Sequence, residues 1–186
     1  CMDEQPYQML DQVRPFERAA PGKAAKEDYE YRRCGTCSVF VAVEPTGGKR
    51  FVQARRHRKR ADFARFVRHL LRRYPKARRI HLVLDNLNTH NVASLYEAFE
   101  PAEARRLAEK LEIHYTPKHG SWLNMAEIEL SILSRQCMTG YFESREQLTT
   151  AVAQWEQARN NQHAGINWRF TTADARIKMR KLYPIL

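Results

Sequence analysis

The sequence predicts a single α/β domain in which helices flank a sheet, and three patterns lead to this prediction. Apolar residues recur at helical spacing across residues 59–74, which predicts an amphipathic helix. Residues 79–84 form a nearly continuous apolar run, typical of a central strand buried on both faces. Residues 36–43 and 50–54 are rich in strand-forming side chains and flank a Pro-Thr-Gly-Gly turn, so together they predict a hairpin.

The remaining segments continue the alternation of strands and helices. Residues 91–110 are predicted as one or two helices broken near Pro101, and residues 111–116 as a short strand. Three further helices are predicted at residues 124–138, 144–161 and 172–183. Residues 5–33 are polar and contain three prolines, so we expect a long irregular loop there; loops of this length are often functional.

The charge of the chain indicates a polyanionic partner. Its 186 residues suit one domain, and 32 Lys and Arg against 21 Asp and Glu give a net charge of +11. Such an excess favours nucleic acid, because Lys and Arg displace counterions from phosphates, although a solubilising surface would carry the same charge. No apolar run approaches the roughly 20 residues that span a bilayer, so we expect no membrane partner.

The four cysteines indicate reduced thiols. Cys1, Cys34, Cys37 and Cys137 show no spacing typical of a disulfide framework. Cys34 and Cys37 form one CxxC pair, whereas structural zinc sites usually take four ligands from two such pairs. Residues three apart in a strand also point to opposite faces. We therefore favour a cytoplasmic protein without zinc at this pair.

Three carboxylates stand where they could hold metal ions. Asp85 directly follows the 79–84 run, at the end of a strand where open α/β sheets bind ligands, although a turn residue is common there too. Glu127 lies one turn into a predicted helix, where a carboxylate can simply complement the helix dipole. Asp3, near the start of the chain, indicates nothing alone. Together the three would suit Mg²⁺, and two such ions can clamp an in-line phosphoryl displacement.

Three sequence blocks resemble the catalytic blocks of bacterial insertion-sequence transposases of the mariner-like superfamily. They are Met2-Asp3-Glu4, the block from Leu84 to His90 (LDNLNTH) and the block from Thr116 to Glu127 (TPKHGSWLNMAE). The second and third blocks are long and specific, and the first is short. The resemblance extends from residue 1 to about residue 160.

This resemblance implies a ribonuclease-H-like fold with a mixed five-stranded sheet. It implies a DDE triad, here Asp3, Asp85 and Glu127, that holds two Mg²⁺ or Mn²⁺ ions for cut-and-paste transposition. Because only two residues precede Asp3, we expect the first strand to be largely truncated. We expect residues 1–186 to form the catalytic domain, with the helices of about 144–186 as an extension and the upstream helix-turn-helix region absent.

The resemblance also implies the partners and setting of the domain. They are the inverted-repeat ends of a transposon, target DNA, and a second copy of the protein in a homodimeric synaptic complex. The expected location is the bacterial cytoplasm, in association with the nucleoid.

Glu129 competes with Glu127 for the third acid position. The two side chains point about 200° apart on a helix, so only one can face a shared site. Apolar periodicity places Glu129 nearer the buried face, among Met125, Ile128 and Ile132. The family pattern Leu-Asn-x-x-Glu selects Glu127, and we follow it.

Several polar residues are candidates for contact with DNA. Arg32 and Arg33 end a segment that interleaves aromatic and basic residues. Asn86, Asn88 and His90 follow the second acid and could support the metal site, contact DNA or form a capped turn. Lys118 and His119 precede the third acid and could touch phosphate or belong to an ordinary loop. Trp122 could stack on a base, but packing is favoured. The expected DNA-contacting residues are Arg32, Arg33, Asn88, His90, Lys118 and His119.

The sequence therefore favours a DNA transposase that uses divalent metal ions for phosphoryl transfer. A ribonuclease-H-like nuclease is an alternative, because fold alone does not fix function. A domesticated remnant that only binds DNA is another. The extended Gly-Ser-Trp-Leu-Asn block favours the transposase over the first, and the three intact acids favour it over the second.

Overall fold

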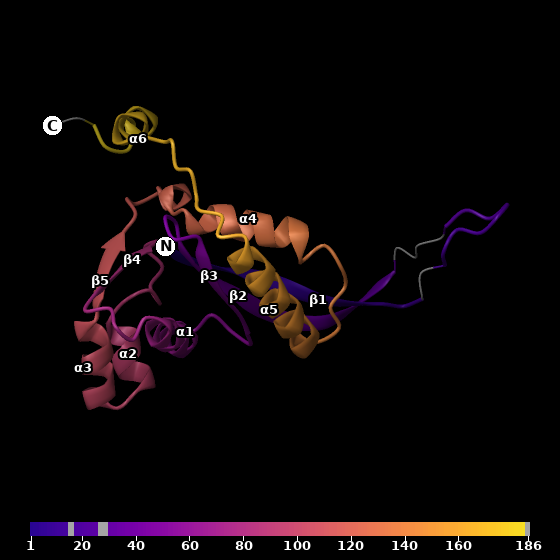
Figure 1. Ribbon diagram of the computed structural model, residues 1–186, viewed down its shortest axis with the longest axis horizontal. Coiled ribbons are helices and arrows are strands. Elements are labelled where there is room, and N and C mark those ends of the chain that lie inside the picture. The colour runs from indigo at the N-terminus through magenta and orange to yellow at the C-terminus, as the bar shows by residue number, and fades with distance from the viewer. Residues whose placement is uncertain (15–16, 26–29, 185–186) are drawn as a thin grey trace.

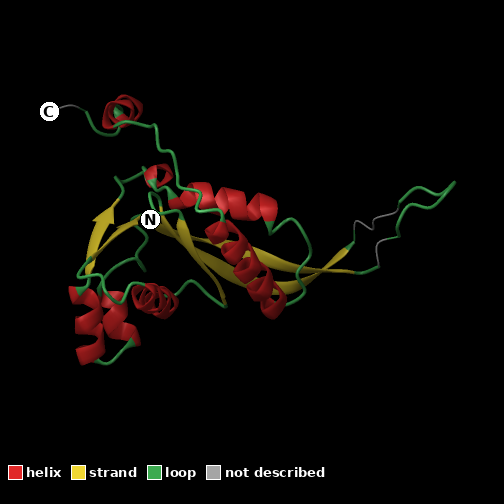
Figure 2. Ribbon diagram, in the orientation of Figure 1, coloured by secondary structure: helices red, strands yellow, loops and turns green. Residues whose placement is uncertain are grey.

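Residues 1–14, 17–25 and 30–184 are described by a computed structural model (Figure 1). The strands are β1 (Met2–Gln12), β2 (Tyr31–Glu44), β3 (Lys49–Arg55), β4 (Ile80–Leu84) and β5 (Leu111–Tyr115). The helices are α1 (Arg60–Arg73), α2 (Ala93–Ala98), α3 (Pro101–Glu109), α4 (Ala126–Gln136), α5 (Arg145–Asn161) and α6 (Thr172–Met179), with a short 3₁₀ helix η1 (Ser121–Leu123) before α4. Figure 2 shows the resulting mixture of helices and strands, which confirms the predicted α/β class.

The strands form two hydrogen-bonded sheets. β1, β2 and β3 make an antiparallel sheet in that order, and β4 pairs in parallel with β5. β1 and β4 contact each other, but no ladder joins them in the described residues. The five strands thus form a three-stranded sheet and a two-stranded sheet, in place of the expected single five-stranded sheet. This arrangement remains consistent with a ribonuclease-H-like domain.

The expectation of a largely truncated first strand is wrong. β1 runs for 11 residues, and Asp3 is its second residue, so the strand follows this acid. Much of the expected irregular loop is also strand, because β1 and β2 pair from Met2 to Gln12; residues 15–16 and 26–29 of that loop lie outside the described part. Pro6 is compatible with the strand because β1 lies at the sheet edge, where a missing N–H costs no ladder bond. In Figure 1 the β1–β2 hairpin projects as a long arm.

The alternating side chains of β2 separate two hydrophobic cores. Phe40 and Ala42 join the core that holds α1, α2, α3 and the inner side chains of β4. Val39 and Val41 join the opposite core, which holds α4 and α5 through residues such as Leu133 and Trp155. Each face of the antiparallel sheet is therefore covered by helices (Figure 1). α5 belongs to the packed body, whereas α6 contacts the η1 region, where Lys178 lies over the Trp122 ring.

The predicted elements around β4 are confirmed, with one difference in burial. α1 matches the 59–74 helix, and the helical region after β4 divides before Pro101, which occupies the first position of α3. Leu82 and Leu84 are buried in the first core. His81 is exposed, so β4 is covered on one face only, contrary to the expectation from its apolar run.

A buried ion pair fixes α4 to the antiparallel sheet. Arg50 of β3 donates from Nη2 to Glu129 Oε1 over 2.6 Å, and both side chains are at most 1 % exposed. Arg50 also donates from Nη1 to the carbonyl of Gly48 at 2.6 Å, and Arg159 of α5 approaches Glu129 Oε1 at 3.5 Å. Glu129 therefore neutralises a guanidinium inside the protein and joins three elements.

The Glu129→Gln variant should have a lower free energy of unfolding than the Glu127→Gln variant. Removing one partner of a buried pair leaves an uncompensated charge, which costs about 3–5 kcal/mol, whereas exposed positions usually change stability by about 0.5 kcal/mol or less. Urea unfolding of Glu129→Gln and Glu127→Gln measures the loss of stability at each position. Equal stability of the two variants would show that the ion pair does not hold α4 in place.

Candidate active site

Asp3 lies at the beginning of β1, where the sheet meets the end of β4. The residue is 7 % exposed, and its Oδ1 accepts the backbone N–H of Glu4 at 2.8 Å. Because side chains alternate along a strand, Met2 and Glu4 share one face of β1 and Asp3 occupies the other. Met2 packs into the first core, which fixes the strand and with it the position of Asp3.

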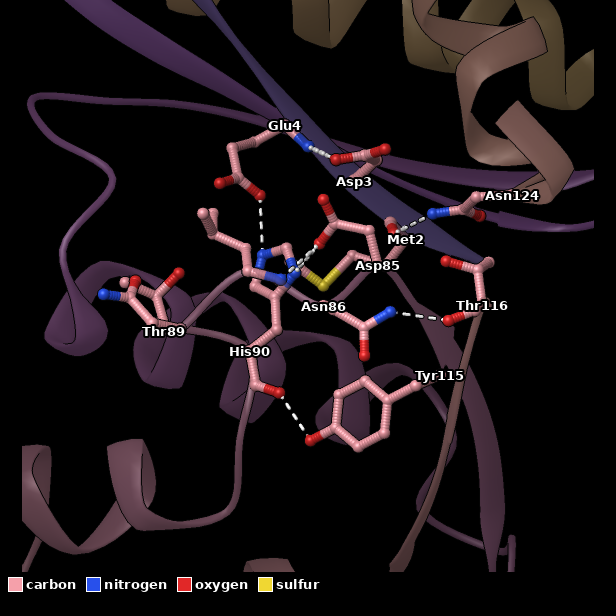
Figure 3. Close-up of polar contacts among 12 residues, drawn as sticks. Met2, Asp3, Glu4, Asp85, Asn86, Thr89, His90, Tyr115, Thr116 and Asn124 are labelled. Carbon is pink, nitrogen blue, oxygen red and sulfur yellow. Dashed lines mark hydrogen bonds and ion pairs between the residues drawn. The ribbon is translucent and has the colours of Figure 1, made fainter. Parts of the chain in front are cut away.

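Asp85 follows β4 directly and is held by local hydrogen bonds. Its Oδ1 accepts the backbone N–H of Leu87 at 3.1 Å, and it lies 2.6 Å from Nδ1 of His90. The hydrogen bond from His90 lowers the pKa of Asp85, so this carboxylate is ionised at neutral pH. Figure 3 shows Asp85 beside Asp3, between His90 and β1.

His90 connects the two strands that carry these acids. Its Nε2 lies 2.8 Å from Glu4 Oε2, so one buried ring bridges β1 and the segment after β4 (Figure 3). Phe63 of α1 packs on the ring, with centroids 5.0 Å apart. Burial alone lowers the pKa of His90, but the hydrogen bonds with Asp85 and Glu4 outweigh it and raise that pKa to about 9. The ring is therefore an imidazolium that donates to both carboxylates.

Asn124 positions the beginning of α4 against β1. It is fully buried, and its Nδ2 donates to the carbonyl of Met2 at 2.7 Å (Figure 3). The backbone carbonyl of Asn124 accepts the backbone N–H of Glu127 at 3.1 Å. These contacts attach the first turn of α4 to the strand that carries Asp3. Glu127 is exposed there and lies close enough to raise the pKa of Asp3, whereas Glu129 is occupied by Arg50.

Asp85 and Glu127 thus lie close enough to Asp3 to repel its carboxylate, although the oxygens of the three acids do not all lie within 4.8 Å of one another. Burial raises the pKa of Asp3 to about 7; its backbone hydrogen bond opposes this shift, and repulsion from Asp85, Glu127 and Glu4 adds to it. A carboxyl group with this pKa is partly protonated near neutral pH. Among the described residues, His90 is the one cation in contact with these carboxyl groups, so the cluster carries a net negative charge, as is typical of sites that bind cations.

The residues predicted to contact DNA have different surroundings. Arg32 and Arg33 are exposed on the β1–β2 arm, where Arg32 forms an ion pair with Asp11. Lys118 and His119 are exposed in the loop after β5. Asn88 is exposed beside the second acid.

His90 differs from these residues because it is 1 % exposed and uses both ring nitrogens. Asp85 and Glu4 occupy both ring nitrogens, so these contacts do not favour DNA contact from His90, which stays a prediction. Its contacts fit the other interpretation of the sequence, support of the acid cluster.

Trp122 packs edge-to-face on Phe170, with ring centroids 5.2 Å apart.

Two supporting residues were missed by sequence reasoning. Glu4 follows Asp3 directly, but a single acidic neighbour carries no signal of a contact with a residue 86 positions away. Asn124 belongs to the third block, and its place two residues before a helix could have suggested a capping role. Both act through contacts between segments, which a pattern within one segment does not contain.

Replacing Asp3 with Asn should stabilise the metal-free protein at pH 8. The pKa of Asp3 is about 7 in the fold against its usual 3.8, so the folded state loses stability as pH rises through this window. Removing the ionised group should raise the free energy of unfolding by on the order of 1–3 kcal/mol in EDTA. In urea unfolding, the difference in free energy of unfolding between Asp3→Asn and the unaltered protein should narrow as pH falls from 8 toward 4. The control is Glu109→Gln, at an exposed acid outside the cluster. If Asp3→Asn is no more stable than Glu109→Gln at pH 8, ionised Asp3 does not destabilise the fold.

The imidazolium of His90 should be visible by NMR. Its ring should titrate with a pKa of about 9, and Asp85→Asn should lower that pKa by removing one charged acceptor. The replacement Glu109→Gln, at an exposed residue of α3, should leave the titration unchanged. A His90 pKa near 6.5 in the unaltered protein would mean that the bridge to Glu4 and Asp85 is not formed.

Comparison with known proteins agrees with this geometry. The family described as DDE superfamily endonuclease matches residues 1–149, which include all three acids and both sheets. No curated protein and no solved structure matched the chain. None of the helices in the described residues has the length and apolar character to span a bilayer. The chain therefore belongs to the DDE superfamily of endonucleases, and it carries a DDE transposase catalytic domain.

Proposed function

We propose that this domain cleaves transposon-end DNA and joins it to target DNA, with Asp3, Asp85 and Glu127 as the catalytic acids. The observation that carries the proposal is the meeting of β1, the end of β4 and the first turn of α4, which bear the three acids. Repulsion of the buried Asp3 carboxylate by Asp85 and Glu127 supports it. Membership of the family supports a transposase or nuclease function.

The donor set fits two Mg²⁺ or Mn²⁺ ions. All three candidate ligands are carboxylates, which hard divalent cations prefer, and the unneutralised charge around Asp3 would be relieved by a cation. Such ions supply charge stabilisation at the scissile phosphate and a more acidic water or hydroxyl nucleophile.

The protein's own groups hold this site in place. Asp85 keeps its carboxylate ionised and oriented because His90 donates to it. Asn124 holds the first turn of α4 to β1, which keeps Glu127 opposite Asp3. A nucleophilic oxygen, from water and then from the freed 3′-hydroxyl, attacks phosphorus as the bond to the leaving oxygen breaks.

The DNA backbone would be held by polar and basic residues in the loops that follow β4 and β5 and on the β1–β2 arm. Lys118 and His119 lie in the exposed loop between β5 and α4, and Asn88 lies in the loop after Asp85. Arg32 and Arg33 extend the basic surface onto the β1–β2 arm. The net charge of +11 favours association with phosphate and predicts a binding affinity that falls with salt. A homodimeric synaptic complex remains part of the proposal.

Nicking of supercoiled plasmid DNA in Mn²⁺ tests the proposal. The unaltered protein should nick, while Asp85→Asn and Glu127→Gln should each reduce the rate by about 100-fold or more, because each removes charge stabilisation used in the transition state. Glu109→Gln is the matched control and should cut normally.

Undiminished nicking by Asp85→Asn would overturn the assignment of the acids. Cleavage of an RNA–DNA hybrid, with no action on duplex DNA, would favour the ribonuclease-H-like alternative. Binding of DNA without cleavage in Mn²⁺ or in Mg²⁺ would favour a domesticated remnant that only binds DNA.

A further inference from the structure

The exposed face of the β4–β5 sheet carries a second group of metal-ligating side chains. His81 of β4 lies opposite Glu112 of β5 in the parallel register, and His114 lies two residues beyond Glu112 on the same face. Leu82 and Leu84 of β4 point to the other face, into the first core. In the described residues this is the one group of three His, Cys, Asp or Glu side chains whose ligand atoms all lie within 4.8 Å of one another.

The three ligand atoms form a small triangle. His81 Nδ1 lies 2.9 Å from His114 Nε2, and Glu112 Oε1 lies 3.5 Å from each of these nitrogens. In a tetrahedral zinc site with bonds of about 2.0–2.1 Å, neighbouring ligand atoms are about 3.3 Å apart. The observed separations bracket that value, so an ion could join all three atoms with little movement of the side chains.

The surroundings of these three side chains orient the Glu112 carboxylate and leave the ligand atoms accessible to an ion from solvent. Arg79 Nη1 pairs with the other carboxylate oxygen, Glu112 Oε2, at 3.1 Å, which orients the carboxylate and leaves Oε1 toward the histidines. The two imidazole rings are stacked, with centroids 5.2 Å apart and planes 22° apart. All three side chains are at least 40 % exposed, so a metal ion can enter from solvent and retain a water molecule as its fourth ligand.

We propose that His81, Glu112 and His114 form a site for a first-row transition metal, with Zn²⁺ as the preferred ion. Two imidazole nitrogens and one carboxylate suit Zn²⁺ and Co²⁺, whereas Mg²⁺ prefers oxygen ligands alone. The site is separate from the Asp3 cluster in both residues and ligand chemistry, and it does not rest on the proposed DNA cleavage.

The ion would reinforce the parallel ladder that already joins β4 to β5. β4 and β5 pair only with each other in the described residues, and β4 leads directly into Asp85. A metal held by one residue of β4 and two of β5 would join the strands at their exposed face. Because the ion binds the folded arrangement, it should raise the unfolding temperature of the protein.

Cobalt spectroscopy on the untagged, EDTA-treated protein tests the site. Adding one equivalent of Co²⁺ should give the visible absorption of tetrahedral cobalt, and Zn²⁺ should abolish it while excess Mg²⁺ should not. His81→Ala, His114→Ala and Glu112→Gln should each weaken Zn²⁺ binding on the order of tenfold or more in calorimetric titration. These side chains are exposed, so the variants should fold. His57→Ala, at an exposed histidine elsewhere, is the matched control and should bind normally.

Two further results separate this proposal from its alternatives. Asp85→Asn should keep the cobalt spectrum, so loss of DNA cleavage and loss of this site can be told apart. Absence of tetrahedral absorption, or thiolate-to-cobalt charge transfer that assigns the ion to cysteine, would overturn the proposal. Unchanged Zn²⁺ affinity in His114→Ala would overturn it as well.

Discussion

His90 occupies the junction on which the arrangement of the acids depends. β1 and β4 share no hydrogen-bonded ladder in the described residues, so side chains must align the strand that carries Asp3 with the strand that leads to Asp85. The imidazolium provides this connection by donating to Glu4 on one side and Asp85 on the other. Its burial strengthens both contacts, because low local dielectric strengthens hydrogen bonds between charged partners.

The buried acids of this domain fall into two kinds. Glu129 is paired with Arg50, and its role is to hold α4 against the sheet. Asp3 is surrounded by other carboxylates, and the cost of ionising it is visible in its raised pKa. A protein with a net charge of +11 thus keeps a concentrated negative site at the meeting point of β1, β4 and α4. Such an arrangement lowers stability and is typical of sites that bind cations.

Sequence patterns predicted the elements better than their pairing. α1 and β4 were predicted because their apolar periodicity is strong, and α3 because Pro101 sets its first turn. β1 was missed because its many polar residues and Pro6 conceal the strand pattern. Pairing between β1 and β2 depends on contacts between segments, as do the bridge through His90 and the ion pair of Glu129. Helical periodicity placed Glu129 on the buried face, and family resemblance was needed to select Glu127.

The acid cluster is tested most directly by a structure from crystals soaked in Mn²⁺, with the ions located by anomalous scattering. We expect Mn²⁺ to be held by carboxylate oxygens of Asp3, Asp85 and Glu127, with Glu129 still paired to Arg50. Manganese coordinated by Glu129, or an Asp3 cluster that stays free of metal at saturating Mn²⁺, would contradict it.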